Sequence, residues 1–529
     1  MKHRLALPAL VAAAAIALTA CTGSTGSSDA DDAPAEISVG VTEPELIIPG
    51  RQTVAYDINM AVWAPLTYID AEGELSYVAA ESIETDDSQT YTITLREGWT
   101  FHDGTPVTAQ DYVDSWNAVA YGPNAFENSG QLAKVEGYDD VTSEDPATEM
   151  SGLVVVDDLT FTVTLTGPDS QFPMQLSQAQ TAMYPMPASA FEDFDAYNAH
   201  PIGNGAFQFT EDYEEGEPIV LTAYEDYQGE EPTVDQITFV PYTDTNTAYN
   251  DVLAGNLDVA SLPASKMTQA ESDFGADHVY AFEAPGISYL GIPLDDERYQ
   301  DIRVRQAISM AIDRETINDV IYGGLYTPAT AFTPDIEPGT PTGICGEYCE
   351  YHPEEAKALL EEAGGFEGTI EIYYPGGVGL DDFYTAIANS IRQALDVETI
   401  ATPSADWAEF YENRLNGDTP GPYFSRWGAL YPSQQATLRA MFIEGGGCDG
   451  CVGEYDAEVA ELMDAADAAV TDEEVETAYR AVQERLMETF PVPPLFNESY
   501  AYVTSERVAV LNTSAAGNPN YSMTELVDE

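Results

Sequence analysis

LREGWTFHDGTPVTAQD, from Leu95 to Asp111, is the segment of this chain that indicates its architecture most clearly. It continues from TYTIT, in which apolar and polar residues alternate as they do in a half-buried strand. Asp103 and Gly104, followed by Thr-Pro, are typical of a turn. Thr108, with Asp111 three residues later, predicts the capped start of a helix. The segment therefore predicts a strand joined to a helix through a turn.

Comparable patterns run along the rest of the chain. TFTVTLT, residues 160–166, alternates like a second half-buried strand. Helices are predicted after Thr108, over Asp301–Ile321, from Pro353 to the glycine pair at 364–365, and from Thr471 to about Phe490. We expect an α/β protein of more than one lobe, because about 500 residues exceed one typical domain.

The N-terminus has the pattern of an export signal. Lys2 and Arg4 precede an apolar run that is too short to span a bilayer as a helix. The run ends in LTAC, residues 18–21, which resembles the lipobox of bacterial lipoproteins. That resemblance implies that a signal peptide, residues 1–20, is removed and that Cys21 is lipidated. An ordinary signal peptide with a chance cysteine is the alternative.

The segment after this cysteine predicts a tether. Residues 21–35 are dominated by Ser, Gly, Asp and Ala, and they cannot bury enough apolar surface to fold. We therefore expect a flexible leash between a lipid anchor and a folded body.

Acidic residues dominate the composition. The chain has 92 Asp and Glu residues against 18 Lys and Arg residues, for a formal net charge of −74. Such a surface repels nucleic acid, so we expect no nucleic-acid partner. Because the acids are spread along the whole chain, we attribute them to solubility in a salty or alkaline habitat. Attraction of a cationic ligand is the alternative.

Four cysteines besides Cys21 form two close pairs, Cys345 with Cys349 and Cys448 with Cys451. Even sets of close cysteines in exported proteins favour disulfides, formed either within each pair or between the two loops. A four-thiolate zinc site is the alternative.

No motif nominates an enzyme. The five histidines are scattered without metal-like spacing, and the chain has neither a phosphate-binding loop nor a nucleophile elbow. His102 adjoins Asp103, but turn chemistry explains that pair. We expect no catalysis, no cofactor and no metal.

Four blocks in conserved order connect the chain to one family. Residues 95–111 closely resemble the string LR-x-G-x-x-F-x-DGTP-x-T-A-x-D of the extracellular solute-binding proteins that serve peptide and nickel ABC importers. PIGNGAF (201–207), AGNLD (254–258) and the segment DIRVRQA to AIDR (301–314) are similar to later blocks of that family. The sequence of residues 244–258 looks most like that of actinobacterial oligopeptide-binding lipoproteins.

The resemblance implies a class II fold like that of periplasmic binding proteins. Two α/β lobes close on a ligand like a flytrap, and an extra third domain enlarges the body. Lobe I would comprise residues 36–66, 200–286 and 498–529, the extra domain residues 67–199, and lobe II residues 287–497. Ligand would shift the population toward the closed state.

The resemblance also implies where a ligand binds. The family's GW-x-ADY segment, on the pocket floor, corresponds to residues 426–431, and its EW-x-x-F block corresponds to residues 406–410. A strand at residues 51–54 would face the ligand backbone. The implied ligand-binding residues are Trp427, Trp407, Arg426, Gly428, Ala429, Leu430, Tyr431, Arg414, Arg51, Thr53 and Phe126. For the two tryptophans, a place in the lobe core is the alternative.

One position departs from the family pattern. The Asp of ADY, which pairs with the free α-amino group of a peptide in peptide binders, is Leu430 here. A buried ammonium group without a partner is costly. Either another acid substitutes, or the ligand lacks a free amine at that end. Blocked peptides, siderophores, oligosaccharides and nickel chelates therefore stay open as ligands.

The function implied by the resemblance is capture and delivery of a solute. We expect a monomeric, extracytoplasmic lipoprotein, anchored to the outer face of the cell membrane, that binds oligopeptides or peptide-like solutes and delivers them to ABC permease subunits. A sensory or signalling lipoprotein that binds a peptide is the alternative from another class.

The cysteine pattern yields a direct test. If Cys345, Cys349, Cys448 and Cys451 are all oxidised, a thiol reagent will label none of them in the denatured, unreduced mature protein. Mass spectrometry of the labelled chain measures this, with the reduced protein as control. Four labelled thiols would contradict the disulfide assignment.

Overall fold

The computed structural model of the chain describes residues 34–71, 73–177, 181–514 and 517–527. The predicted signal peptide, Cys21 and all of the predicted tether except its last two residues lie outside this described part. Residues 35–529 group into one unit. None of its described helices is both long and apolar enough to cross a membrane.

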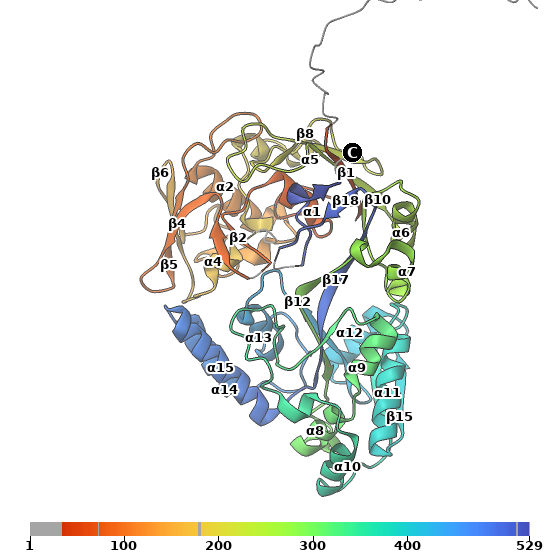
Figure 1. The fold of residues 1–529 in the computed structure, drawn as a ribbon. Helices are drawn as coiled ribbons and strands as arrows, with labels where there is room; N and C mark the ends of the chain where they lie inside the picture. Colours follow the sequence, from red (N-terminus) through yellow and green to blue (C-terminus); the bar gives the residue numbers. More distant parts are fainter. Residues whose placement is uncertain (1–33, 72, 178–180, 515–516, 528–529) are drawn as a thin grey trace, which may run out of the picture. The chain divides into compact units, whose positions relative to one another are not determined.

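Strands and helices alternate along the unit (Figure 1). The strands are β1 (Glu36–Thr42), β2 (Thr67–Ile69), β3 (Leu75–Tyr77), β4 (Ala80–Glu84), β5 (Thr90–Leu95), β6 (Leu153–Asp157), β7 (Thr160–Thr164), β8 (Phe207–Phe209), β9 (Ile219–Ala223), β10 (Gln236–Tyr242), β11 (Val259–Ser261), β12 (Val279–Gly291), β13 (Thr327–Pro328), β14 (Ile370–Tyr374), β15 (Thr399–Pro403), β16 (Tyr423–Gly428), β17 (Pro494–Thr504), β18 (Val508–Val510) and β19 (Glu525–Leu526).

The helices cover these strands. They are α1 (Tyr56–Val62), α2 (Ala109–Ala120), α3 (Tyr138–Val141), α4 (Phe172–Gln175), α5 (Phe194–Ala199), α6 (Thr245–Leu253), α7 (Ala270–Phe274), α8 (Ile302–Met310), α9 (Arg314–Ile317), α10 (Pro353–Glu362), α11 (Asp381–Leu395), α12 (Trp407–Asn416), α13 (Gln434–Phe442), α14 (Ala457–Asp467) and α15 (Asp472–Thr489).

One eleven-stranded sheet passes through both lobes in the order β15-β14-β16-β12-β17-β11-β1-β10-β9-β8, with β13 beside β17. The long antiparallel strands β12 and β17 are central to it and extend into both lobes (Figure 1). Their pairing is interrupted between Glu283 and Ile287. The predicted lobe boundaries at 286/287 and 497/498 both fall inside these two strands.

Residues 95–111 and the strand before them fold as predicted. Strand β5 ends at Leu95, and α2 begins after Thr108. The Asp111 carboxylate accepts a hydrogen bond from the Thr108 backbone N–H at 2.8 Å, and the Thr108 hydroxyl accepts one from the Asp111 N–H at 3.4 Å. This reciprocal capping box fixes the start of α2. Strands β5 and β7, both predicted, are neighbours in the sheet β4-β5-β7-β6.

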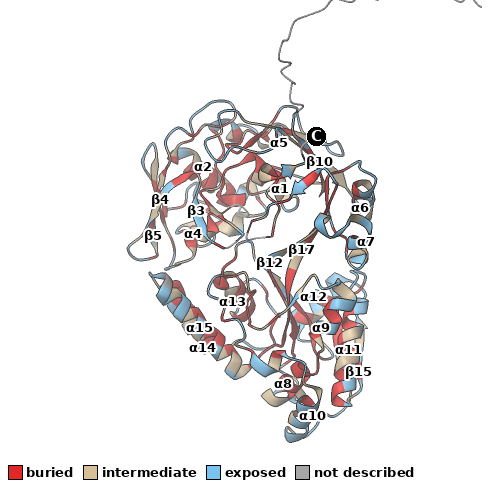
Figure 2. Ribbon diagram, viewed as in Figure 1, coloured by how far each residue is buried: buried red, intermediate tan, exposed pale blue. Residues whose placement is uncertain are grey.

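The predicted lobe I and the predicted extra domain share a hydrophobic cluster. Val39 and Phe239, on strands of lobe I, belong to the same buried cluster as Trp116 and Phe161 of the extra domain. Lobe II is built around separate clusters. Most residues of α2 and of α13 are buried (Figure 2). The extra domain therefore packs as part of the N-terminal body.

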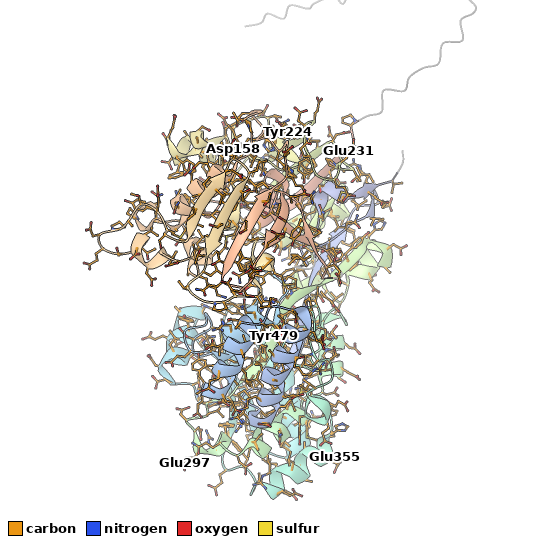
Figure 3. The ribbon with its side chains drawn as sticks, turned by 90° about the vertical axis from the view of Figure 1, so that its left-hand side faces the viewer. Asp158, Tyr224, Glu231, Glu297, Glu355 and Tyr479 are labelled. Carbon is orange, nitrogen blue, oxygen red and sulfur yellow. A yellow bond between two sulfur atoms is a disulfide. The ribbon has the colours of Figure 1, made fainter. Side chains whose placement is uncertain are left out.

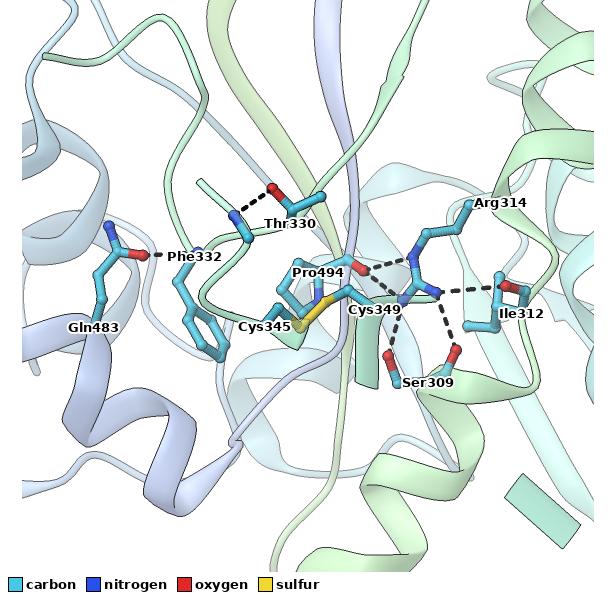
Figure 4. Close-up of a disulfide and its surroundings, with 10 residues drawn as sticks. Ser309, Ile312, Arg314, Thr330, Phe332, Cys345, Cys349, Gln483 and Pro494 are labelled. Atoms are coloured by element: carbon cyan, nitrogen blue, oxygen red, sulfur yellow. Dashed lines mark hydrogen bonds between the residues drawn. A yellow bond between two sulfur atoms is a disulfide. The ribbon is translucent and has the colours of Figure 1, made fainter. Parts of the chain in front are cut away.

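The single helix predicted over Asp301–Ile321 is wrong. Helix α8 ends at Met310, α9 covers only Arg314–Ile317, and a π-helical turn follows. The break arises because Arg314 turns inward and is only 2 % exposed. Its guanidinium donates to Ser309 O at 3.0 Å and to Pro494 O of β17 at 2.7 Å (Figure 4). The other two predicted helices are present as α10 and α15, and Thr471 caps α15.

Each cysteine pair is closed locally by a disulfide, Cys345 with Cys349 and Cys448 with Cys451. The first disulfide lies beside the loop of Thr330 and Phe332 (Figure 4). Among the described residues, no group of His, Cys, Asp and Glu side chains is arranged to hold a metal ion.

Arg314 provides a test of this packing. Replacing it with methionine removes the donors to three backbone carbonyls of lobe II. Because each unsatisfied buried acceptor costs about 1–3 kcal/mol, Arg314→Met should lower the free energy of unfolding by at least about 3 kcal/mol in urea titrations. Arg392→Met, at an exposed position of α11, is the matched control and should change it little. Equal stabilities of the two variants would contradict this role.

Candidate functional site

The segment that the resemblance places on the pocket floor lies at the predicted lobe boundary. It is the end of β16, which pairs with β12 so that Gly428 faces Gly286 and Trp427 faces Ile287. The next residue, Ala429, donates its backbone N–H to Pro285 O at 2.7 Å. The structure therefore brings the predicted segment to the interruption in the β12–β17 pairing.

Arg426 is held by an acid that the sequence analysis did not identify. Its guanidinium donates to both carboxylate oxygens of Glu498 on β17, with Nε–Oε1 at 2.8 Å and Nη2–Oε2 at 2.6 Å. The pair reaches across β12, the strand between them, at Gly286. A methyl group at Gly286 would lie 3.1 Å from Glu498 Oε2, so the absence of a side chain there leaves room for the carboxylate.

Electrostatics favour the charged form of Arg426. Burial disfavours the guanidinium ion, but the Glu498 carboxylate outweighs that effect and the pKa of Arg426 is raised. Tyr326 and Tyr500 lie close enough to feel both charges, and burial raises the pKa of each phenol. A bidentate pair with aromatic neighbours is a rigid polar element at the lobe boundary.

The rest of the predicted segment presents apolar surface. Trp427 is half-buried, with its ring edge 3.3 Å from the position of a methyl group on Gly447. Leu430 is 36 % exposed. Tyr431 is half-buried, and its hydroxyl donates to Gln435 Oε1 at 3.2 Å.

The two predicted residues of α12 differ in exposure. Trp407, its first residue, is 46 % exposed and meets the ring of Phe424 edge-on. Arg414 is only 8 % exposed, and its guanidinium lies over the rings of Phe410 and Tyr411. Burial lowers the pKa of Arg414. Trp407 therefore offers a surface for a ligand, whereas Arg414 packs inside lobe II.

The predicted residues of the N-terminal body lie together. The Arg51 guanidinium lies 5.4 Å from the ring centre of buried Phe126 and pairs with Glu127 at 3.3 Å. Thr53 is exposed. The strand predicted at residues 51–54 is wrong, because this segment has no strand partner and runs irregularly into α1.

The second disulfide supports the site strand. Cys448 Sγ lies 3.7 Å from Arg426 O, and the Ser425 hydroxyl donates to Cys451 O at 2.9 Å. The local Cys448–Cys451 disulfide thus fixes a loop against the end of β16.

A polar network joins the extra domain to lobe II. The Gln435 amide donates to Asp169 Oδ1 and to Asp467 Oδ1, each at 2.7 Å. Asp169 also pairs with Lys134, and Asp467 pairs with Arg439 at 2.5 Å. The network connects predicted lobe II to the extra domain at a point separate from β12 and β17. No sequence motif predicts this network, because acids are too common in this chain to be informative.

A cavity of about 420 Å³ lies inside the N-terminal body. Its lining includes Asp57, Trp63, Trp99, Tyr227 and Tyr521. Burial raises the pKa of Asp57 to about 7. No local sequence pattern predicts this cavity, because it is assembled from segments that are far apart in the chain and include the C-terminal tail.

The chain is similar to known solute-binding proteins. The family model described as "Bacterial extracellular solute-binding proteins, family 5 Middle" matches residues 74–447. The chain is 28% identical to the periplasmic oligopeptide-binding protein OppA of Salmonella typhimurium, over 73% of each chain. It is 26% identical to the probable deoxycholate-binding periplasmic protein YgiS of Escherichia coli, over 76% of each.

A solved structure shares the fold. The unliganded open form of the periplasmic murein tripeptide-binding protein MppA superposes with a TM-score of 0.83, at 21% identity, over 94% of this chain and 98% of that one. The match confirms the predicted class II fold of two lobes with an extra domain.

Asp57 gives a pH-dependent prediction. Because its pKa is raised on folding from 3.8 to about 7, the unfolded chain releases this proton first, and the contribution of Asp57 to stability falls as the pH rises from about 4 to 7. Asp57→Asn should therefore match the wild type at pH 4 and melt at a higher temperature at pH 8. Thermal unfolding at both pH values tests this, with the exposed Asp86→Asn as control. A difference that does not depend on pH would contradict the shift.

Proposed function

The chain belongs to the bacterial extracellular solute-binding proteins of family 5, and from this membership we propose that it captures oligopeptides or peptide-like solutes for an ABC importer. The observation that carries the proposal is the position of residues 426–431. They lie beside the interruption in the pairing of β12 with β17, at the predicted lobe boundary, which supports a place for a ligand there. A ligand held there contacts both lobes, which is how binding energy can favour one arrangement of the lobes over another.

The names of two relatives and the apolar surface of the predicted site favour peptides as ligands. OppA and MppA are named for an oligopeptide and for a murein tripeptide. The half-buried Trp427 and the exposed Trp407 and Leu430 offer apolar and aromatic contacts to side chains of varied shape. YgiS is named for deoxycholate, so a non-peptide solute is the alternative ligand.

The remaining parts of the proposal concern where the protein works. The leader ending at Cys21 and the tether of residues 21–35 support an extracytoplasmic lipoprotein anchored to the outer face of the cell membrane. A captured solute would then reach permease subunits in the same membrane. The chain would act as a monomer and catalyse no reaction.

Calorimetry of the mature protein against a tri- to pentapeptide library tests the proposal. We expect micromolar or tighter binding, and Trp427→Ala should weaken it at least about tenfold, since a central aromatic contact contributes about 2 kcal/mol. Tyr351→Ala, at an exposed site away from residues 426–431, is the control. Binding of only sugars, bile salts or nickel chelates would contradict the peptide assignment.

A further inference from the structure

The cavity of about 420 Å³ in the N-terminal body shares no lining residue with the segment 426–431. Its described lining comes mainly from α1, the paired strands β2 and β3, residues 227–230 and the C-terminal residues 518–523 (Figure 1). Every described residue that lines it belongs to predicted lobe I or to the predicted extra domain. Its volume is in the range of small-molecule sites, about 300–1,000 Å³. The cavity can therefore hold a molecule without help from predicted lobe II.

Aromatic side chains form much of the wall of this cavity. Trp63 and Trp99 are buried, and Tyr521 is only 5 % exposed. Tyr68 on β2 is half-buried, and Tyr77 on β3 is 40 % exposed. The cavity therefore extends from a buried aromatic wall to an edge that solvent can reach.

Two carboxylates line the cavity without a partner. Among the described residues, neither Asp57 nor Glu230 accepts a hydrogen bond or makes an ion pair. Asp57 is half-buried near Tyr521, because burial and then the charge of Asp57 raise the pKa of that phenol. Glu230 is exposed near Tyr227, because burial and then the charge of Glu230 raise the pKa of Tyr227 to about 12.

The basic residue in the described lining, Arg96, is already bonded elsewhere. Its guanidinium pairs with Glu81 at 3.0 Å and donates to Val78 O at 3.0 Å. It therefore does not neutralise the two free carboxylates. Water can hydrate Asp57, but it brings no positive charge to a carboxylate that burial disfavours.

The walls and the charges select the same kind of ligand. The face of an aromatic ring carries a partial negative charge and attracts cations, most strongly at tryptophan. The free carboxylates attract cations as well and repel anions. The buried rings also favour an apolar body, which a metal ion lacks.

We propose that this cavity binds a small organic cation with an apolar or aromatic body. The body packs against Trp63, Trp99 and Tyr68, and the ammonium group of the ligand donates to the Asp57 carboxylate. Glu230 attracts the cation at the open edge. This second site lies outside the proposed peptide-binding function and does not depend on it.

Three ligands with one phenyl ring provide the experiment. Phenethylamine, phenethyl alcohol and phenylacetate are positive, neutral and negative at pH 8, where Asp57 is largely ionised. Each is titrated by calorimetry into the mature protein without peptide. Because a hydrogen bond to a charged group contributes about 1.5–3 kcal/mol, the amine should bind at least about tenfold more tightly than the alcohol, and phenylacetate should bind most weakly.

Two variants locate the binding. Asp57→Asn should lose at least about tenfold in affinity for the amine and little for the alcohol. Tyr68→Ala should weaken both ligands by a similar factor, because they share the phenyl ring. Asp86→Asn, at an exposed acid of the extra domain, is the control and should behave as the wild type.

Thermal unfolding of each variant shows that it is folded at the temperature of the titration. Equal affinities of the wild type for the amine and the alcohol would overturn the proposal, as would an amine that does not bind at millimolar concentrations. Unchanged binding of the amine by Asp57→Asn or by Tyr68→Ala would also overturn it. None of these results bears on the peptide-binding function, which is tested by the peptide library.

Discussion

The pairing of β12 with β17 is the constraint on which the rest of the structure depends. With lobe II taken as residues 287–497, both passages of the described chain between the lobes run inside this ladder. The lobes can change their arrangement only by bending these strands. The ladder is weakest between Glu283 and Ile287, where Pro285 has no N–H to donate and Gly286 has no side chain to pack.

Side chains near this weak point form bonds that resist bending. The Arg426–Glu498 pair spans β12 at Gly286, so it ties the end of β16 to β17. On the other side of the boundary, Gln435 joins Asp169 of the extra domain to Asp467 of α14. A bend that separates the two sides must break these bonds, at about 1.5–3 kcal/mol for each bond to a charged group. If a ligand that bridges the lobes changes their arrangement, its binding energy must overcome the same contacts.

The scarcity of basic residues shapes both the interior and the surface. Several of the 18 basic side chains serve the fold, as Arg314, Arg439 and Arg507 do by bonding buried carbonyls or carboxylates. Few remain to offset the acids outside. Exposed acids therefore occur at both ends of the body, among them Asp158 and Glu231 at one end and Glu297 and Glu355 at the other (Figure 3). This spread agrees with a role in solubility better than with one acidic binding surface.

Local order in the sequence was enough to predict β5, α2 and α15, because their capping contacts join residues three positions apart. Motif resemblance likewise predicted the family and the fold. The break after α8 could not be predicted, since Arg314 meets Pro494 from 180 positions away. Nor could local patterns single out Glu498 among 92 acids. Only the tertiary structure decided which acids meet at the lobe boundary, because strand pairing and loop packing bring distant segments together there.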